Sequence, residues 1–165
     1  MDALELVRRK KPMALLLCVG PDSNGERKRL QSRAQALGLA DHVFFTGMLQ
    51  GEDLKAAYAC ANLLALVSKK ENFGLTVADA LAAGLPVVVS EGVDVAAGWK
   101  STGPVRRVKP EAEEIAEAII DLLERGERHG LPDAEARSLA EREWGKTRIV
   151  ELVDRYEQTL GVGNL

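Results

Sequence analysis

Short apolar runs alternate with helix-like segments along most of this chain. The clearest runs are MALLLCVG, HVFFTG, NLLALVS and PVVVS, at residues 13–20, 42–47, 62–68 and 86–90, and VRRVKP at 105–110 is weaker. Their apolar residues are continuous rather than alternating, which is typical of parallel strands covered on both faces. Because helix patterns separate the runs, their order predicts an α/β fold with a doubly wound, Rossmann-like parallel sheet.

The helix patterns include a start signal and a stop signal. Ser23 and Glu26 have the spacing of a capping box, so VGPDSNGE reads as a turn and helix cap rather than a phosphate cradle. In 111–125 five apolar residues share one helix face, and Gly126 is predicted to end that helix. Two further helices, at about 133–143 and 146–160, have no strand between them. We therefore expect 130–165 to pack on the sheet.

Composition narrows the classes of protein. A chain of 165 residues favours one domain, at 1–165. Lys and Arg number 22 and Asp and Glu 25, and this weak acidity argues against a nucleic-acid partner. Cys18 and Cys60 lie in apolar runs and have no metal-ligand spacing. No apolar stretch approaches the ~18 residues of a membrane span. We expect a cytoplasmic protein, or one docked peripherally at a membrane through a part outside this sequence.

Residues 69–90, KKENFGLTVADALAAGLPVVVS, place a loop, a helix and a buried strand where doubly wound sheets bind ligands. Leu75, Ala78, Leu81 and Ala82 mark the helix, which Gly84 is predicted to stop. A helix starting near Gly74 offers free N–H groups that suit a phosphate. Glu71 and Asp79 flank this start and can accept hydrogen bonds from sugar hydroxyls. Spacing alone favours a solvated face for both acids, and it favours packing over ligand contact for Phe73.

This stretch resembles the signature of the GT-B fold, family 4 type, retaining glycosyltransferases, also called glycosyltransferase group 1. In that family an acid, one residue and Phe-Gly precede a second acid, a small-residue helix and Gly-x-Pro-Val. The segments LLLCVG, LGLADHVFFTG, LKAAYACANLLALVS and VKPEAEEIAEAIIDLLE follow the order and spacing of the family. The resemblance covers most of the chain and corresponds to the C-terminal, donor-binding domain of the GT-B fold.

The resemblance implies a role for each matching position. Glu71 matches the catalytic-site acid that contacts the donor sugar near its reacting carbon. Asp79 matches the acid that holds the ribose diol, and the backbone of Met48 and Leu49 matches the loop that lines the base. The backbone amides implied to meet the sugar and the diphosphate are those of Phe73, Gly74, Leu75 and Thr76.

Family membership would make the chain the donor-binding part of an enzyme. Such enzymes transfer a sugar, here expected to be a hexose, from a UDP-, GDP- or ADP-linked donor to an acceptor with retention of configuration. They use no metal ion and no other cofactor. The alternative is a non-catalytic module that binds a nucleotide sugar or a protein, and Asp79, where the family usually has Glu, slightly favours it. A nucleotide-sugar epimerase of similar architecture fits the spacing less well.

The chain departs from the family near its start. The N-terminal Rossmann domain of the family, and a first strand with Gly-Arg and Lys-Gly motifs, have no counterpart in this sequence. We therefore expect the isolated chain to be inactive, since half a cleft cannot position both substrates. The runs at 13–20 and 62–68 would lack a common neighbour. Either they pair with each other, or a partner such as a second copy fills the gap; a complete six-stranded sheet would contradict both.

Overall fold

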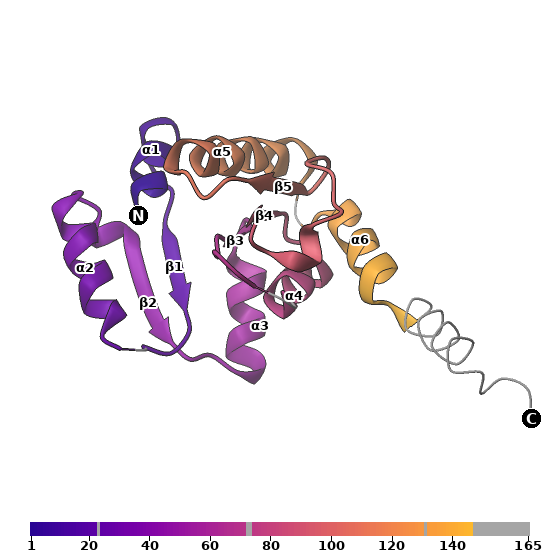
Figure 1. Ribbon diagram of the computed structural model, residues 1–165, viewed down its shortest axis with the longest axis horizontal. Helices are drawn as coiled ribbons and strands as arrows, with labels where there is room; N and C mark the ends of the chain where they lie inside the picture. Colours follow the sequence, from indigo (N-terminus) through magenta and orange to yellow (C-terminus); the bar gives the residue numbers. More distant parts are fainter. Residues whose placement is uncertain (23, 72–73, 131, 147–165) are drawn as a thin grey trace, which may run out of the picture.

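A computed structural model describes residues 1–146 apart from Ser23, Asn72, Phe73 and Leu131 (Figure 1). The strands are β1 (Leu16–Val19), β2 (Val43–Gly47), β3 (Leu64–Leu66), β4 (Val87–Ser90) and β5 (Val105–Val108). The α-helices are α1 (Asp2–Lys10), α2 (Glu26–Ala36), α3 (Gly51–Cys60), α4 (Leu75–Ala83), α5 (Ala112–His129) and α6 (Ala134–Trp144). Two short 3-10 helices are η1 (Ala40–His42) and η2 (Asp94–Ala96). The predicted α/β alternation is confirmed.

All strand pairs are parallel, but the strands form two sheets. β1 pairs with β2, so that Leu16 lies opposite Val43. In the second sheet β4 is central and pairs with β3 on one side and β5 on the other. Within the described ranges β1 and β3 do not pair with each other, so the first of the two expected outcomes for these strands is wrong. The strands therefore form two sheets, and β1 and β3 each keep one edge without a strand partner among the described residues.

Helices α1 and α5 join the two halves of the molecule. The two helices lie side by side (Figure 1), and their contact is apolar, with Val7 of α1 packed against Ala116 and Ile120 of α5. An ion pair supports the contact, since Lys11 Nζ lies 2.8 Å from Glu127 Oε1. These helices therefore hold the first sheet and the second sheet in one domain.

The second sheet contains the best-packed part of the core. Every residue of β4 is fully buried, as the continuous apolar run predicts for a strand covered on both faces. On one face Val87 and Val89 pack with residues of α4 and α6, including Leu81. On the other face Val88 packs with Leu122 of α5.

The predicted end of α5 is wrong. Gly126 does not end α5, which continues to His129, because the Gly130 N–H donates to the Gly126 carbonyl at 2.8 Å and the turn closes only at Gly130. A glycine inside a helix costs only about 1 kcal/mol, which the long apolar face of α5 outweighs. α2 begins after Gly25, its N-cap residue, which has a left-handed φ of 73°, and the predicted cap residue Ser23 lies outside the described residues.

α6 confirms the predicted helix at about 133–143. Asp133 is its N-cap residue, and the helix packs against α4 through Ala136, Leu139 and Ala140. The predicted helix at 146–160 falls almost entirely outside the described residues. The predicted packing of the C-terminal region on the sheet domain therefore rests on α6 alone.

Candidate functional site

Glu71 is fixed by the backbone segment that follows β4. It forms an isolated parallel bridge with Val93. The Glu71 N–H donates to the Gly92 carbonyl at 2.8 Å, and the Asp94 N–H donates to the Glu71 carbonyl at 2.8 Å. Because both backbone groups of Glu71 are engaged, the position from which its side chain projects is set by the second sheet.

A second anchor lies just before Glu71. The hydroxyl of Ser90, which is fully buried at the end of β4, donates to the Ser68 carbonyl at 2.5 Å. The loop also passes so close to Gly92 that a Cβ there would collide with the Lys69 carbonyl oxygen. The loop after β3 is therefore held at both Ser68 and Glu71.

The side chain of Glu71 reaches the N-terminal end of α4. Its Oε1 accepts a hydrogen bond from the Gly74 N–H at 3.2 Å. Gly74 is the N-cap residue of α4 and has a left-handed φ of 54°. The predicted helix start is confirmed, and a carboxylate lies at its positive end, where negative charge is favoured. Phe73 lies outside the described residues, so its predicted contact has no structural description.

The predicted helix and its end at Gly84 are confirmed, but most of the residues that marked it are not its buried residues. The buried residues are Val77, Ala80 and Leu81, whereas Leu75 is 69% exposed. Of the four residues that marked the helix only Leu81 is buried. The buried residues of α4 are those that pack against the second sheet and α6. Leu75 and Thr76 are therefore exposed beside Glu71.

Asp79 is exposed one turn into α4 and close to Tyr58 of α3. Burial and, second, the negative charge of Asp79 raise the pKa of Tyr58. The Tyr58 hydroxyl donates to the Thr76 carbonyl in a long hydrogen bond of 3.5 Å. In the part of the chain that the structure describes, the Asp79 carboxylate forms no ion pair, so it can accept hydrogen bonds from a ligand.

The change Asp79→Asn is expected to lower the pKa of Tyr58, because it removes a charge that disfavours tyrosinate. Burial remains, so the pKa should stay above the ordinary tyrosine value. Because folding raises the pKa of Tyr58, its neutral form stabilises the fold at every pH below the ordinary tyrosine pKa. This contribution is lost as the pH rises through the raised pKa. Ultraviolet titration in a Tyr156→Phe background measures Tyr58 alone. Asp53→Asn, at another exposed acid, is the control, and an equal pKa in both variants would contradict the expectation.

The predicted base loop lies at the end of the first sheet. Met48 and Leu49 follow β2 directly, between Gly47 with its left-handed φ of 76° and Gln50, the N-cap residue of α3. Met48 is exposed. Among the described residues no hydrogen bond joins this loop to α4, although α3 starts beside the loop and its Tyr58 reaches Thr76. The structure thus brings Glu71, the start of α4 and Asp79 together and leaves the base loop separate.

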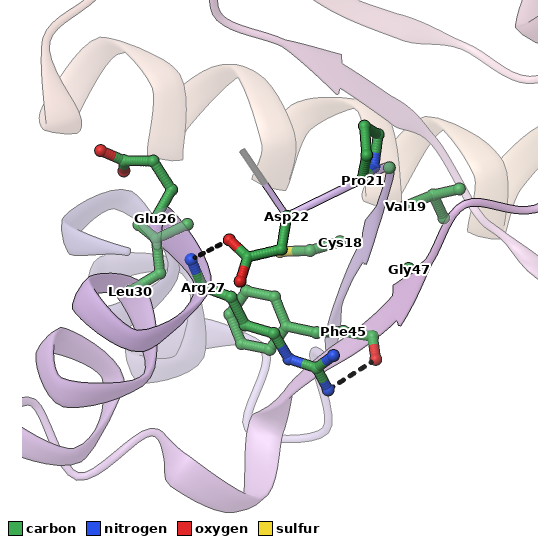
Figure 2. A pocket seen from close by; sticks show the side chains of 10 residues that line it. Cys18, Val19, Pro21, Asp22, Glu26, Arg27, Leu30, Phe45 and Gly47 are labelled. Atoms are coloured by element: carbon green, nitrogen blue, oxygen red, sulfur yellow. Dashed lines mark hydrogen bonds between the residues drawn. The ribbon is translucent and has the colours of Figure 1, made fainter. Parts of the chain in front are cut away.

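A hollow that the sequence did not indicate borders Gly47 (Figure 2). Its lining residues are Cys18, Val19, Gly20, Pro21, Asp22, Glu26, Arg27, Leu30, Phe45 and Gly47. The Arg27 guanidinium lies over the Phe45 ring, 5.6 Å from its centroid, and donates to the Phe45 carbonyl at 3.3 Å. The Asp22 carboxylate accepts the Arg27 backbone N–H at 3.0 Å. The turn predicted before α2 is therefore present, while the Arg27–Phe45 contact across the hollow had no local sequence signal.

The described residues contain neither a metal-binding cluster nor a membrane-spanning helix. No cluster of three or more His, Cys, Asp or Glu side chains in the described ranges is placed to hold a metal ion. None of the described helices combines the length and the apolar character that crossing a membrane requires.

The family of the chain follows from its sequence. Residues 1–138 match the family described as glycosyl transferases group 1. The chain belongs to this family. The predicted resemblance is therefore confirmed, and relatives of the chain are named as glycosyltransferases.

The group 1 relatives are considerably longer than this chain. Mannosylfructose-phosphate synthase of Agrobacterium fabrum is 37% identical over 95 residues, which cover 54% of this chain and 21% of that protein. D-inositol 3-phosphate glycosyltransferase of Saccharomonospora viridis is 30% identical over 164 residues, which cover 94% of this chain and 38% of that protein. The chain thus spans less than half the length of these group 1 relatives.

Solved structures support the fold of the group 1 domain. Anabaena HepE, crystallised in complex with UDP-glucose, superposes with a TM-score of 0.77 at 23% identity, covering 98% of this chain and 43% of the HepE chain. Sucrose-phosphate synthase from Thermosynechococcus elongatus gives a TM-score of 0.76 at 24% identity, covering 98% and 42%. At these identities the likeness establishes the fold, which is that of a GT-B glycosyltransferase domain.

Proposed function

We propose that this domain binds the nucleoside-diphosphate sugar donor of a group 1 glycosyltransferase. The observation that carries the proposal is the Glu71 carboxylate, held 3.2 Å from the Gly74 N–H at the positive end of α4. Thr76 and Asp79 are exposed beside it. UDP-glucose bound to HepE, a protein of the same fold, is the kind of ligand that this arrangement suits.

The diphosphate, sugar and ribose of the donor each have a matching group on α4 or just before it. The diphosphate would accept hydrogen bonds from the N–H groups of Leu75 and Thr76, where the helix dipole favours negative charge. Glu71 would accept hydrogen bonds from the hydroxyls of the sugar. Asp79 lies four residues after Leu75, about 6 Å further along the helix, and would accept from the ribose diol. Since Asp is one methylene shorter than Glu, a bridging water can complete that contact.

The base would lie at the end of the first sheet. The backbone of Met48 and Leu49 is the part of the chain proposed to line it, beside the hollow that borders Gly47. UDP, GDP and ADP donors all fit this proposal, because backbone groups and an apolar side chain do not select one base by themselves.

The reaction proposed for the whole enzyme breaks the bond between the anomeric carbon and the diphosphate oxygen. The nucleoside diphosphate leaves, and an acceptor oxygen bonds to the same face of the sugar while losing its proton. Charge on the leaving group would be met by the helix end and by cationic side chains, without a metal ion. We expect the 165-residue chain alone to give no transfer, because donor and acceptor must be held together. Measured turnover by this chain would contradict that expectation.

Calorimetry with UDP-, GDP- and ADP-sugars, and with the matching nucleoside diphosphates, tests the proposal. Glu71→Gln keeps an oxygen for the Gly74 N–H but removes the charge, so it should weaken sugar-donor binding about tenfold or more and affect the nucleoside diphosphate less. Asp79→Asn should weaken both ligands alike. Glu52→Gln, at an exposed acid of α3, is the control and should bind like the unaltered chain.

The outcomes separate the proposal from its alternative. Binding of one donor class, with both acids sensitive, supports the donor site. No binding of any nucleotide, or binding unaffected by Glu71→Gln and Asp79→Asn, would contradict it and favour a module that contacts a protein instead.

A further inference from the structure

The turn before α2 contains two successive residues with left-handed backbone angles. Asn24 has a φ of 59° and Gly25 a φ of 73°, and in the described part of the chain no other residue except glycine has a positive φ. Two such residues in succession occur in type I′ turns, where Asn followed by Gly is strongly preferred. Asparagine tolerates the left-handed region better than most residues, and glycine has no Cβ to strain there. The shape of this turn therefore favours the sequence Asn-Gly.

The peptide bond between Asn24 and Gly25 is exposed and unhindered. Both residues are exposed, and a Cβ placed on Gly25 would meet no atom within 4 Å. Gly25 is the N-cap residue of α2, so its carbonyl enters the helix and accepts the Arg29 N–H at 3.4 Å. Among the described residues the Gly25 N–H donates no hydrogen bond. The backbone nitrogen of Gly25 can therefore approach the side-chain amide of Asn24.

We propose that Asn24 is a site of spontaneous deamidation, and that its conversion to isoaspartate opens the wall of the neighbouring hollow. The backbone nitrogen of Gly25 loses its proton and bonds to the side-chain carbonyl carbon of Asn24. The bond from that carbon to the side-chain nitrogen breaks, and the nitrogen leaves as ammonia with a proton taken up in its place. Water then opens the cyclic imide at either carbonyl, which gives aspartate or isoaspartate. Water is the co-reactant, and no group is oxidised or reduced.

The glycine that follows distinguishes Asn24 from the other asparagines of the chain. Asn62, Asn72 and Asn164 precede Leu, Phe and Leu, whose side chains shield the attacking nitrogen and restrict the backbone. Asn62 is also exposed and lies outside the helices and strands, so exposure alone does not separate it from Asn24. Asn62 is therefore an internal comparison for the reaction at Asn24.

A hydrogen bond that closes the turn would be disturbed by a longer main chain. Asp22 Oδ1 accepts the Arg27 N–H at 3.0 Å, and Asn24 lies between these two residues in the sequence (Figure 2). The Arg27 guanidinium lies over the Phe45 ring and donates to the Phe45 carbonyl across the hollow. Isoaspartate adds a methylene to the main chain between Asp22 and Arg27, so this pair should separate. Ordinary aspartate leaves the main chain unchanged and, like asparagine, tolerates a left-handed φ.

Both products also add a negative charge at the start of α2. The positive end of the helix favours that charge, whereas the carboxylates of Asp22 and Glu26 oppose it. Arg29 already offsets part of the repulsion, because its guanidinium lies 2.7 Å from Glu26 Oε2. Since the effects of charge oppose each other, the longer main chain of isoaspartate is what should release Arg27.

Storage of the full chain followed by peptide mass spectrometry tests the chemistry. Deamidation should be about tenfold faster or more at Asn24 than at Asn62, because glycine leaves the attacking nitrogen unshielded. The rate should rise with pH, since the nitrogen reacts after losing its proton. Asn24→Gln should give no product in the same time, because its longer side chain must close a larger ring. Asn62→Gln is the matched control and should leave the rate at Asn24 unchanged. Equal rates at Asn24 and Asn62 would overturn the proposal.

Hydrogen exchange of the separated products tests the opening of the hollow. An enzyme that methylates isoaspartate distinguishes it from aspartate, which has the same mass. In the isoaspartate form the Arg27 amide should exchange about tenfold faster or more, while the Leu37 amide at the far end of α2 should not change. Asn24→Asp adds the charge without the methylene and should keep the exchange at Arg27 close to that of the unaltered chain. Unchanged exchange at Arg27 in the isoaspartate form, or equally faster exchange in Asn24→Asp, would overturn the opening of the hollow.

Discussion

We expect the change Asp133→Ala to lower the free energy of unfolding by about 3 kcal/mol, because it leaves a partly buried cation and two helix amides without their acceptor. Asp133 is 5% exposed. Its Oδ1 accepts the N–H groups of Glu135 and Ala136 at 2.9 and 3.2 Å, and its Oδ2 accepts Arg125 Nε at 3.0 Å. The Asp133 N–H donates to the Gly84 carbonyl at 2.8 Å, so one residue ties together the ends of α4, α5 and α6.

Urea denaturation followed by circular dichroism measures this loss. Glu135→Ala is the matched control, because Glu135 Oε2 contacts the same Arg125 at 3.0 Å but its side chain is 66% exposed, and it should cost less than about 1 kcal/mol. Asp133→Asn keeps a cap acceptor and loses the charge, so its cost should lie between the two. A cost for Asp133→Ala no larger than that for Glu135→Ala would show that the buried cluster does not stabilise the fold.

Helices and strands of this fold could be predicted from the sequence wherever a single segment has a local residue pattern typical of the element. The continuous valines of β4 predict a strand covered on both faces, and α4 and α6 on one side with α5 on the other confirm it. Gly74 lies at the predicted start of α4, where its left-handed φ of 54° favours glycine. Glu71 could be singled out only through the family resemblance, since its spacing alone favours a solvated face.

Features that depend on contacts between distant segments were missed. Leu75 carries the same apolar signal as Leu81, yet it is exposed because α4 must fit between the second sheet and α6. The contact of Arg27 with Phe45 has no local pattern, since 18 residues separate the pair. That β1 and β3 lack a common neighbour was expected only through the family resemblance, because an apolar run shows that a strand needs covering but not which strand lies beside it.

Gly74 gives the second large expected effect, on stability and on donor binding together. Gly74→Ala should lower the free energy of unfolding by about 2 to 4 kcal/mol, because its φ of 54° strains any residue with a Cβ and that Cβ would lie 2.5 Å from Val95 Cγ1. Moving the backbone to relieve this contact shifts the N–H groups at the start of α4. If the proposed donor site is right, affinity for the nucleotide sugar should fall about tenfold or more.

Gly25→Ala is a matched control for this change. Gly25 is also an N-cap residue with a left-handed φ, of 73°, but a Cβ there meets no atom within 4 Å, so this variant should show only the strain of the dihedral angle. The double variant Gly74→Ala with Val95→Ala removes the collision and should regain part of the donor affinity. Thermal unfolding and calorimetry read the two effects separately. Equal stability losses for Gly74→Ala and Gly25→Ala would contradict a role for the collision with Val95. A larger stability loss for Gly74→Ala without a change in donor affinity would contradict the donor site but agree with the collision.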